Sequence, residues 1–362
     1  VTPLAKLDGM AGQLGLGGLF VKDESYRFGL NAFKVLGGSF AMAKYIAKEM
    51  GKDVSEMTYD YLTSKKFRDD FGQATFFTAT DGNHGRGVAW AANKLGQKAV
   101  VHMPKGSTQT RFDNIAKEGA SVTIEELNYD DCVRLAAKEA AETPHGVIVQ
   151  DTAWDGYEEI PSWIMQGYGS MAGEAAEQLR EVEVNRPTHV FVQAGVGSLA
   201  GGVVGYFANL YPNNPPKFIV MEAGAADCLY KGAEAGDGEP RIVGGDLQTI
   251  MAGLACGEPN TIGWDILRNH VSAFISCPDW VSAKGMRMLA APVKGDPSVT
   301  SGESGAVGMG VISSIMTDDA YKELREALEL DNSSQVLMFS TEGDTDPDKY
   351  KKIVWGGEYP TV

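Results

Sequence analysis

The segment Gln193–Gly202, which reads QAGVGSLAGG, says most about the fold of this chain. It follows an apolar run, residues 189–193, that is predicted to be a strand, and it opens an apolar stretch that is predicted to be a helix. Glycines let the backbone approach a ligand, and the first turn of a helix offers N–H groups and a positive dipole to an anion. The pattern therefore predicts a phosphate-binding turn, with a plain tight turn as the alternative.

A dinucleotide site would need the glycine spacing G-x-G-x-x-G and an acidic residue about 20 residues further on. Gly195, Gly197 and Gly201 miss that spacing by one position, although Glu222 stands at the end of the next predicted strand. The spacing argues against a dinucleotide-binding protein.

Outward from this segment, short apolar runs rich in β-branched residues alternate with amphipathic or alanine-rich stretches, which predicts an α/β fold with mostly parallel sheets. The predicted strands are 19–22, 75–78, 98–103, 121–124, 147–150, 189–193, 217–221, 273–277 and 335–340. We expect two lobes: a small domain at 73–154 and a large domain formed by 1–72 and 155–362. Ligands bind at the carboxyl ends of strands in such folds, so we expect the site in a cleft between the lobes.

The composition excludes several partners. The 362 residues carry a formal net charge of −16, and an acidic surface repels nucleic-acid and anionic membrane phosphates. No run of about 18 apolar residues predicts a transmembrane helix, and no signal-peptide pattern is present, so a cytoplasmic protein is expected.

The four cysteines are spaced widely, and none belongs to a C-x-x-C pair, which argues against a zinc site. We expect no metal and reduced thiols, with a Cys228–Cys256 disulfide as the alternative.

Four further segments combine glycines or strand ends with reactive side chains. In Phe28–Lys34 a lysine lies in an apolar stretch, where desolvation lowers its pKa and makes it a neutral nucleophile for an aldehyde cofactor; a snorkelling lysine is the alternative. Thr80–Gly87 packs Asp, Asn, His and Arg between glycines, and an N-capped helix is its plain interpretation. Val149–Trp154 and Phe339–Asp346 place carboxylates or hydroxyls at strand ends, which is also typical of turns and caps. There is no G-x-S-x-G, H-E-x-x-H or Walker motif, so hydrolase, zincin and P-loop functions lack support.

In this order, and with Thr2-Pro3-Leu4 at the start, the motifs resemble those of the fold type II, tryptophan-synthase-β-like enzymes that use pyridoxal 5′-phosphate (PLP). Within that group the chain is similar to the diaminopropionate ammonia-lyase family over essentially its whole length. The blocks that carry this resemblance are 21–25, 27–34, 80–90, 103–106, 128–131, 150–154, 163–168, 193–197, 250–260, 301–308 and 340–346.

The resemblance implies a two-lobed architecture and a set of PLP contacts. Lys34 would hold the cofactor covalently beside Phe33, and Asn83 would bond its 3′-oxygen. Ser340 or Thr341 would face the pyridine nitrogen, which a neutral hydroxyl leaves unprotonated. The phosphate would lie in the loop Gly195, Val196, Gly197, Ser198 and Leu199.

The resemblance also implies elimination of ammonia from D- and L-2,3-diaminopropionate, by a homodimer, giving pyruvate and two ammonia. Asp81 stands where related dehydratases usually carry serine, and a carboxylate is the stronger base. We infer that Lys34 removes the Cα proton of the L-isomer and Asp81 that of the D-isomer. Asp81 and Asp151 would hold the leaving ammonium. The substrate contacts are expected from Thr80, Asp81, Gly82, His84 and Asp151.

Two alternatives stay open. One is a serine or threonine dehydratase or racemase of the same fold, and a cysteine-synthase-like enzyme fits less well. The other is a non-catalytic PLP-binding or amino-acid-binding sensor, which would be expected to lose the lysine or the base.

Overall fold

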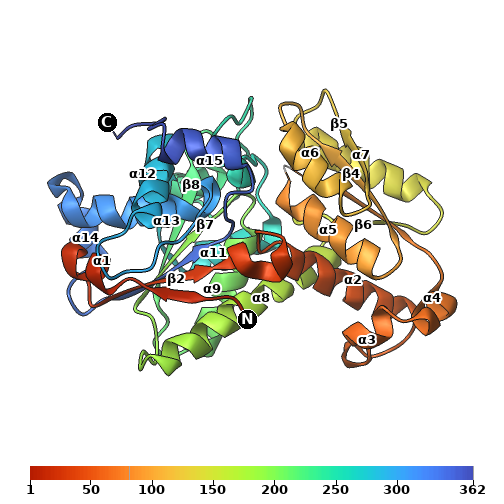
Figure 1. The fold of residues 1–362 in the computed structure, drawn as a ribbon, viewed down its shortest axis with the longest axis horizontal. Coiled ribbons are helices and arrows are strands. Elements are labelled where there is room, and N and C mark those ends of the chain that lie inside the picture. Colours follow the sequence, from red (N-terminus) through yellow and green to blue (C-terminus); the bar gives the residue numbers. More distant parts are fainter. Residues whose placement is uncertain (81, 362) are drawn as a thin grey trace. The chain divides into compact units, whose positions relative to one another are not determined.

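The computed structural model describes residues 1–80 and 82–361, and the chain divides into two compact α/β units. Unit 1 consists of Val1–Phe33 and the chain from Gly169 onward, and unit 2 is Lys34–Tyr168. Each unit has its own sheet (Figure 1). The two α/β units agree with the predicted fold class.

Unit 1 contains a six-stranded sheet in the order β1-β2-β10-β7-β8-β9. Every neighbouring pair is parallel except β1 and β2, which are antiparallel. The inner strands are buried apolar runs, as expected for a parallel sheet covered on both faces. The strands are β1 (Leu4–Lys6), β2 (Gly18–Asp23), β7 (His189–Gln193), β8 (Lys217–Ala223), β9 (Val271–Cys277) and β10 (Gln335–Ser340).

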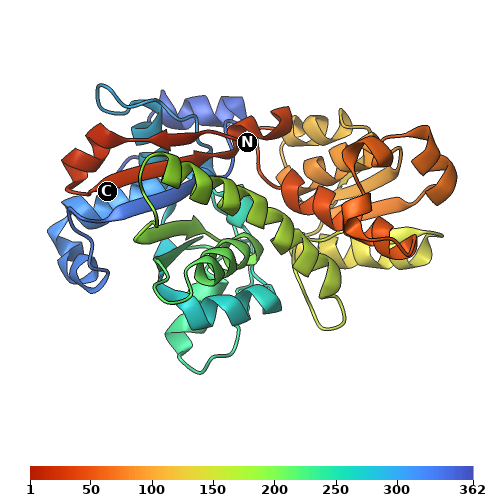
Figure 2. The same cartoon turned by 90° about the horizontal axis from the view of Figure 1, so that it is seen from below.

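Helices cover both faces of this sheet. Residues of α1, α12, α13 and α15 share one hydrophobic core with β2, β7, β8 and β10, whereas α9 packs on β7 and α11 packs on α9 (Figure 2). The α-helices of the unit are α1 (Asp8–Leu14), α9 (Ser198–Leu210), α10 (Cys228–Ala235), α11 (Thr261–His270), α12 (Asp279–Ala290), α13 (Glu303–Thr317), α14 (Lys322–Ala327) and α15 (Pro347–Val354). Short 3₁₀ segments are η1 (Glu24–Gly29), η3 (Ala252–Leu254) and η4 (Asp319–Tyr321).

Unit 2 contains a parallel four-stranded sheet in the order β5-β4-β3-β6. Its strands are β3 (Thr75–Ala79), β4 (Lys98–Met103), β5 (Ser121–Ile124) and β6 (Gly146–Ile148). Its helices are α2 (Val35–Glu49), α3 (Tyr59–Leu62), α4 (Lys65–Phe71), α5 (Asn83–Lys94), α6 (Gln109–Ala116) and α7 (Tyr129–Glu142), with η2 at Val54–Glu56. The helix α8 (Glu159–Glu181) begins in unit 2 and ends in unit 1.

The unit boundaries differ from the expected 73–154 and its complement. Residues 34–72 and 155–168 belong to the smaller unit, because α2 packs against α5 and the first half of α8 packs against α2. Sequence periodicity identifies a helix but does not say which sheet it packs on.

Each predicted strand is present, with small differences at the ends. The strand predicted at 147–150 ends at Ile148, so Gln150 lies in the loop that follows. The short antiparallel strand β1 was missed, because three residues are too few to show an alternating pattern.

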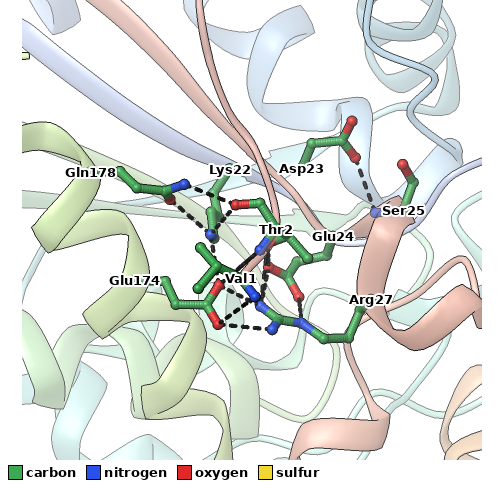
Figure 3. A network of polar contacts seen from close by, with 9 residues as sticks. All are labelled: Val1, Thr2, Lys22, Asp23, Glu24, Ser25, Arg27, Glu174 and Gln178. Carbon is green, nitrogen blue, oxygen red and sulfur yellow. Dashed lines mark hydrogen bonds and ion pairs between the residues drawn. The ribbon is translucent and has the colours of Figure 1, made fainter. Parts of the chain in front are cut away.

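A buried polar network ties three segments of unit 1 together (Figure 3). Arg27 donates hydrogen bonds to the carboxylates of Glu24 and Glu174, and Lys22 donates to Glu174 at 2.8 Å. The Thr2 hydroxyl donates to Glu24 at 2.6 Å. The network therefore fixes α8 against the end of β2 and against η1.

No helix within residues 1–80 and 82–361 combines the length and the apolar character that crossing a membrane requires.

Candidate active site

In unit 2 the predicted polar residues lie where the strand order reverses. The chain runs from β3 to β4 and β5, then returns to β6 on the other side of β3. Right-handed crossovers place the helices before and after such a reversal on opposite faces of the sheet, and ligands of parallel α/β folds commonly bind at this position. Thr80 follows β3, and Gln150 and Asp151 follow β6.

The side chain of Gln150 joins these two strand ends. Its Oε1 accepts hydrogen bonds from the Ala79 N–H (2.8 Å) and the Thr78 hydroxyl (2.9 Å). Its Nε2 donates to the Ala79 carbonyl (3.1 Å) and to the Tyr129 hydroxyl oxygen (2.8 Å). These bonds fix the backbone on which the next residue, Asp151, is presented.

The carboxylate of Asp151 is the centre of the site in unit 2. Lys34 donates to its Oδ2 at 2.7 Å, and Tyr129 donates to its Oδ1 at 3.2 Å. His84 Nδ1 lies 3.8 Å from Oδ2, and the His84 Nε2–H donates to the Val149 carbonyl at 2.8 Å, which orients the ring. We call Lys34, His84, Tyr129 and Asp151 the lysine–aspartate cluster.

Asp151 is 3% exposed, and burial by itself would raise the pKa of its carboxyl group. The charges of His84 and Lys34 and the hydrogen bonds from Lys34 and Tyr129 outweigh burial, and they hold the pKa well below its usual range. The cluster therefore contains a fixed negative charge directly beside the lysine nitrogen.

The loop after β3 is held by Thr80. Its hydroxyl oxygen accepts from the N–H groups of Gly82 (2.9 Å) and Gly85 (3.0 Å), and Asn83 is the first residue of α5. A Cβ atom on Gly85 would collide with the Thr80 side chain, so this turn requires glycine there. Asp81 lies outside the described residues.

The second group of predicted residues lies in unit 1, also at a reversal of strand order, between β7 and β10. Gln193 Nε2 donates to the Phe339 carbonyl (3.0 Å) and to the Thr341 hydroxyl oxygen (2.7 Å). The buried Ser340 hydroxyl donates to Ser301 Oγ at 2.8 Å. The glycine loop after β7 and the hydroxyls after β10 are therefore neighbours.

The glycine loop, residues Ala194–Leu199, leads from β7 into α9. Gly197 is the N-cap residue of α9, and its φ of +98° lies in the region that favours glycine. Close packing surrounds the loop, since a Cβ on Gly195 would lie 3.1 Å from the Gly253 carbonyl oxygen. Ser198 opens the 13-residue helix α9, whose first-turn N–H groups have no acceptors within the helix itself. The loop thus has the form of an anion site at a helix N-terminus.

Residues 1–342 match the family model described as "Pyridoxal-phosphate dependent enzyme". The chain belongs to this family. PLP is therefore its cofactor.

Similar proteins of this family are lyases. The chain is 54% identical over 358 residues to "Diaminopropionate ammonia-lyase" of Salmonella typhimurium and 50% identical over 360 residues to that of Escherichia coli. In both cases 99% of this chain and 88% of the relative are covered. The crystal structure of the Escherichia coli protein in complex with D-serine matches with a TM-score of 0.93 and 48% identity, covering 100% of this chain and 89% of that chain.

The residues of this PLP enzyme fit the cofactor in three respects. The glycine loop offers a helix N-terminus for a phosphate. Lys34 is a half-buried lysine with a carboxylate partner. Ser340 and Thr341 carry buried hydroxyls at the end of β10, the strand beside β7, which leads into the glycine loop. The individual contacts with PLP, including that of Asn83 and that of Phe33, stay predictions.

Some site residues were missed by sequence reasoning. No functional role was predicted for Tyr129, Gln150 and Ser301, because nothing in their local sequence indicates a contact with Asp151 or Ser340. Asn260 was missed as well, although an asparagine directly before an amphipathic run is a recognisable N-cap signal. Its side chain bonds the glycine loop.

All four cysteines are buried free thiols. The Cys228 thiol lies 3.8 Å from the Cys256 carbonyl oxygen and 3.9 Å from that of Gly195, next to the glycine loop. Burial raises the pKa of the Cys228 thiol, so it is an inert neutral group there.

Proposed function

We propose that this protein is an ammonia-lyase that converts 2,3-diaminopropionate and water into pyruvate and two molecules of ammonia. The observation that carries the proposal is the buried carboxylate of Asp151, 2.7 Å from the nitrogen of Lys34. A fixed anion beside the catalytic lysine suits a substrate whose leaving group is an ammonium, and it suits the neutral hydroxyl of serine less well. The near full-length identity of 50–54% to diaminopropionate ammonia-lyases supports the same substrate.

PLP, when bound, supplies the electron sink that makes the Cα proton of the substrate removable. We assign its phosphate to Gly195, Val196, Gly197, Ser198 and Leu199, its pyridine nitrogen to Ser340 or Thr341, its 3′-oxygen to Asn83, and its covalent attachment to Lys34 beside Phe33.

The chain's own groups would move the protons. Lys34 in its neutral form takes the Cα proton of the L-isomer, and Asp151 stabilises the ammonium that results, since it already accepts a hydrogen bond from this nitrogen. Asp81 takes the Cα proton of the D-isomer. Asp151, whose low pKa keeps it ionised, holds the β-ammonium of either isomer. Thr80, Gly82 and His84 shape the substrate side of the site.

We also propose that the enzyme is a cytoplasmic homodimer, as the family resemblance implies. The four reduced cysteines are consistent with a reducing compartment.

The function is tested by measuring pyruvate and ammonia release from D- and L-2,3-diaminopropionate and from D- and L-serine, with PLP present. We expect both diaminopropionate isomers to be turned over, with two ammonia per pyruvate, and little turnover of serine. Turnover of serine alone would make the protein a dehydratase. A PLP absorbance band without turnover of any of the four would favour an amino-acid sensor.

A further inference from the structure

A buried asparagine outside the predicted site holds the glycine loop in place. Asn260 is 0% exposed and directly precedes α11. Its backbone N–H donates to the Val196 carbonyl at 2.7 Å, and its Nδ2 donates to Ser198 Oγ at 2.7 Å. Asn260 therefore binds two residues of the loop, one through its backbone and one through its side chain.

The other half of the Asn260 amide fixes the asparagine itself. Its Oδ1 accepts from the N–H groups of Ile262 (2.9 Å) and Gly263 (3.0 Å), which caps α11. The start of α11 also lies directly on the loop, since a Cβ on Gly263 would be 2.8 Å from the Gly197 carbonyl oxygen. With Oδ1 bound to two N–H groups, the amide cannot flip, and Nδ2 has to point at Ser198.

This orientation determines the role of the Ser198 hydroxyl. An amide nitrogen only donates, so Ser198 Oγ is the acceptor in this bond and its own hydrogen is directed away from Asn260. Ser198 is the first residue of α9, where the helix N–H groups and dipole favour an anion. A hydroxyl held in this way adds a donor to the backbone N–H groups of the loop.

We propose that Asn260 is a positioning residue for the cofactor's phosphate, which sets the Ser198 hydroxyl as a phosphate donor and makes the site selective for PLP over unphosphorylated pyridoxal. This inference rests on the proposed assignment of the glycine loop to the phosphate of PLP. Asn260 would contact no reacting atom and would act only through Ser198 and Val196.

The test is Asn260→Asp, which keeps the oxygen that caps α11 and replaces the Nδ2 donor by a carboxylate oxygen. That oxygen would accept the Ser198 hydrogen and place a negative charge beside the loop. Titration of the apoprotein with PLP and with pyridoxal, followed by absorbance, gives both dissociation constants. We expect the constant for PLP to rise about 10- to 100-fold, the range of a lost hydrogen bond to a charged group, and that for pyridoxal to change less than about threefold.

Asn269→Asp is the matched control, because it makes the same substitution at an exposed position of α11 and should leave both constants unchanged. Ser198→Ala provides a second variant should Asn260→Asp not fold. It should also weaken the binding of PLP but not that of pyridoxal. In the double variant the losses should not add, because both act on one donor. The ³¹P resonance of the bound cofactor should shift in Asn260→Asp and not in the control.

The inference is overturned if Asn260→Asp weakens the binding of PLP and of pyridoxal equally. It is also overturned if Ser198→Ala leaves the selectivity for PLP over pyridoxal unchanged. If neither PLP nor pyridoxal produces an absorbance band with the wild-type apoprotein, the assignment of Lys34 as the cofactor's attachment point is overturned instead. The proposed function depends on that assignment.

Discussion

Two carboxylates carry the proposed chemistry at the scale of single residues. Asp151 sits within the lysine–aspartate cluster, and three neighbours keep it ionised in spite of burial. Asp81 is assigned the proton on the opposite face of the substrate. This division predicts that substitutions of the two residues differ in their dependence on substrate stereochemistry.

We expect Asp81→Asn to lose most activity on D-2,3-diaminopropionate and to retain activity on the L-isomer, because Lys34 serves the latter. Asp151→Asn should lower kcat/KM for both isomers by about 100-fold or more, the usual contribution of a positioned acid–base group. Steady-state kinetics with each isomer measure this, with exposed Asp155→Asn as the control that should change little. An equal loss of activity on both isomers in Asp81→Asn would refute the two-base scheme.

Close helix packing inside unit 2 matters at the scale of elements, because it fixes the helix that starts right after Lys34. The first turn of α2 lies against α8, and a Cβ on Gly37 would be 2.6 Å from Cε1 of Tyr168 and 2.7 Å from Cγ2 of Ile164. On the other helix, Gly167 lies against the backbone of Leu36 and Gly37. Only a residue without a side chain lets the two helices approach so closely.

Gly37→Ala should therefore destabilise the protein by about 1–3 kcal/mol, the cost of overpacking a well-packed contact. Gly12→Ala is the matched control, since that helical glycine has open space around its Cβ position and alanine is the better helix former. Urea unfolding followed by circular dichroism gives both values. A Gly37→Ala variant as stable as Gly12→Ala would show that the α2–α8 contact can relax without cost.

Charge sets the pH range of stability at the scale of the whole molecule. The net charge is −16, so lowering the pH first removes repulsion between carboxylates. Lowering the pH has the opposite effect on the polar network around Glu174 (Figure 3), where it removes stabilisation. Burial of Glu174 would raise its pKa, but hydrogen bonds from Arg27 and Lys22 lower it to about 2.

A carboxyl group with a lowered pKa stabilises the fold above its unfolded pKa, about 4.3, and that contribution is lost as the pH falls towards about 2. Glu174→Gln should cost about 2–4 kcal/mol at pH 7, because buried Lys22 loses its carboxylate partner and Arg27 keeps only that of Glu24. The difference from wild type should shrink below about pH 4. Unfolding midpoints measured from pH 3 to pH 8 test this, with exposed Glu177→Gln on the same helix as the control. A Glu174→Gln difference that is independent of pH would contradict it.

The order of elements and the main chemical groups could be predicted from the sequence. Strand–helix alternation gave the fold class, and the segments around Lys34, Thr80, Asp151 and Gly197 were found because reactive residues stand next to glycines or strand ends. These are local signals, since a turn that needs glycine, or a helix that needs a cap, is dictated by neighbouring residues.

Only the tertiary structure determined which partners these groups have. The contact of Tyr129 with Asp151 joins residues 22 positions apart, and that of Asn260 with Ser198 joins residues 62 positions apart. The domain boundaries depend in the same way on the packing of α2 against α5. A hydrogen bond between distant segments leaves no periodicity or spacing in the sequence, because it depends on where the chain folds back and not on the neighbours of either residue.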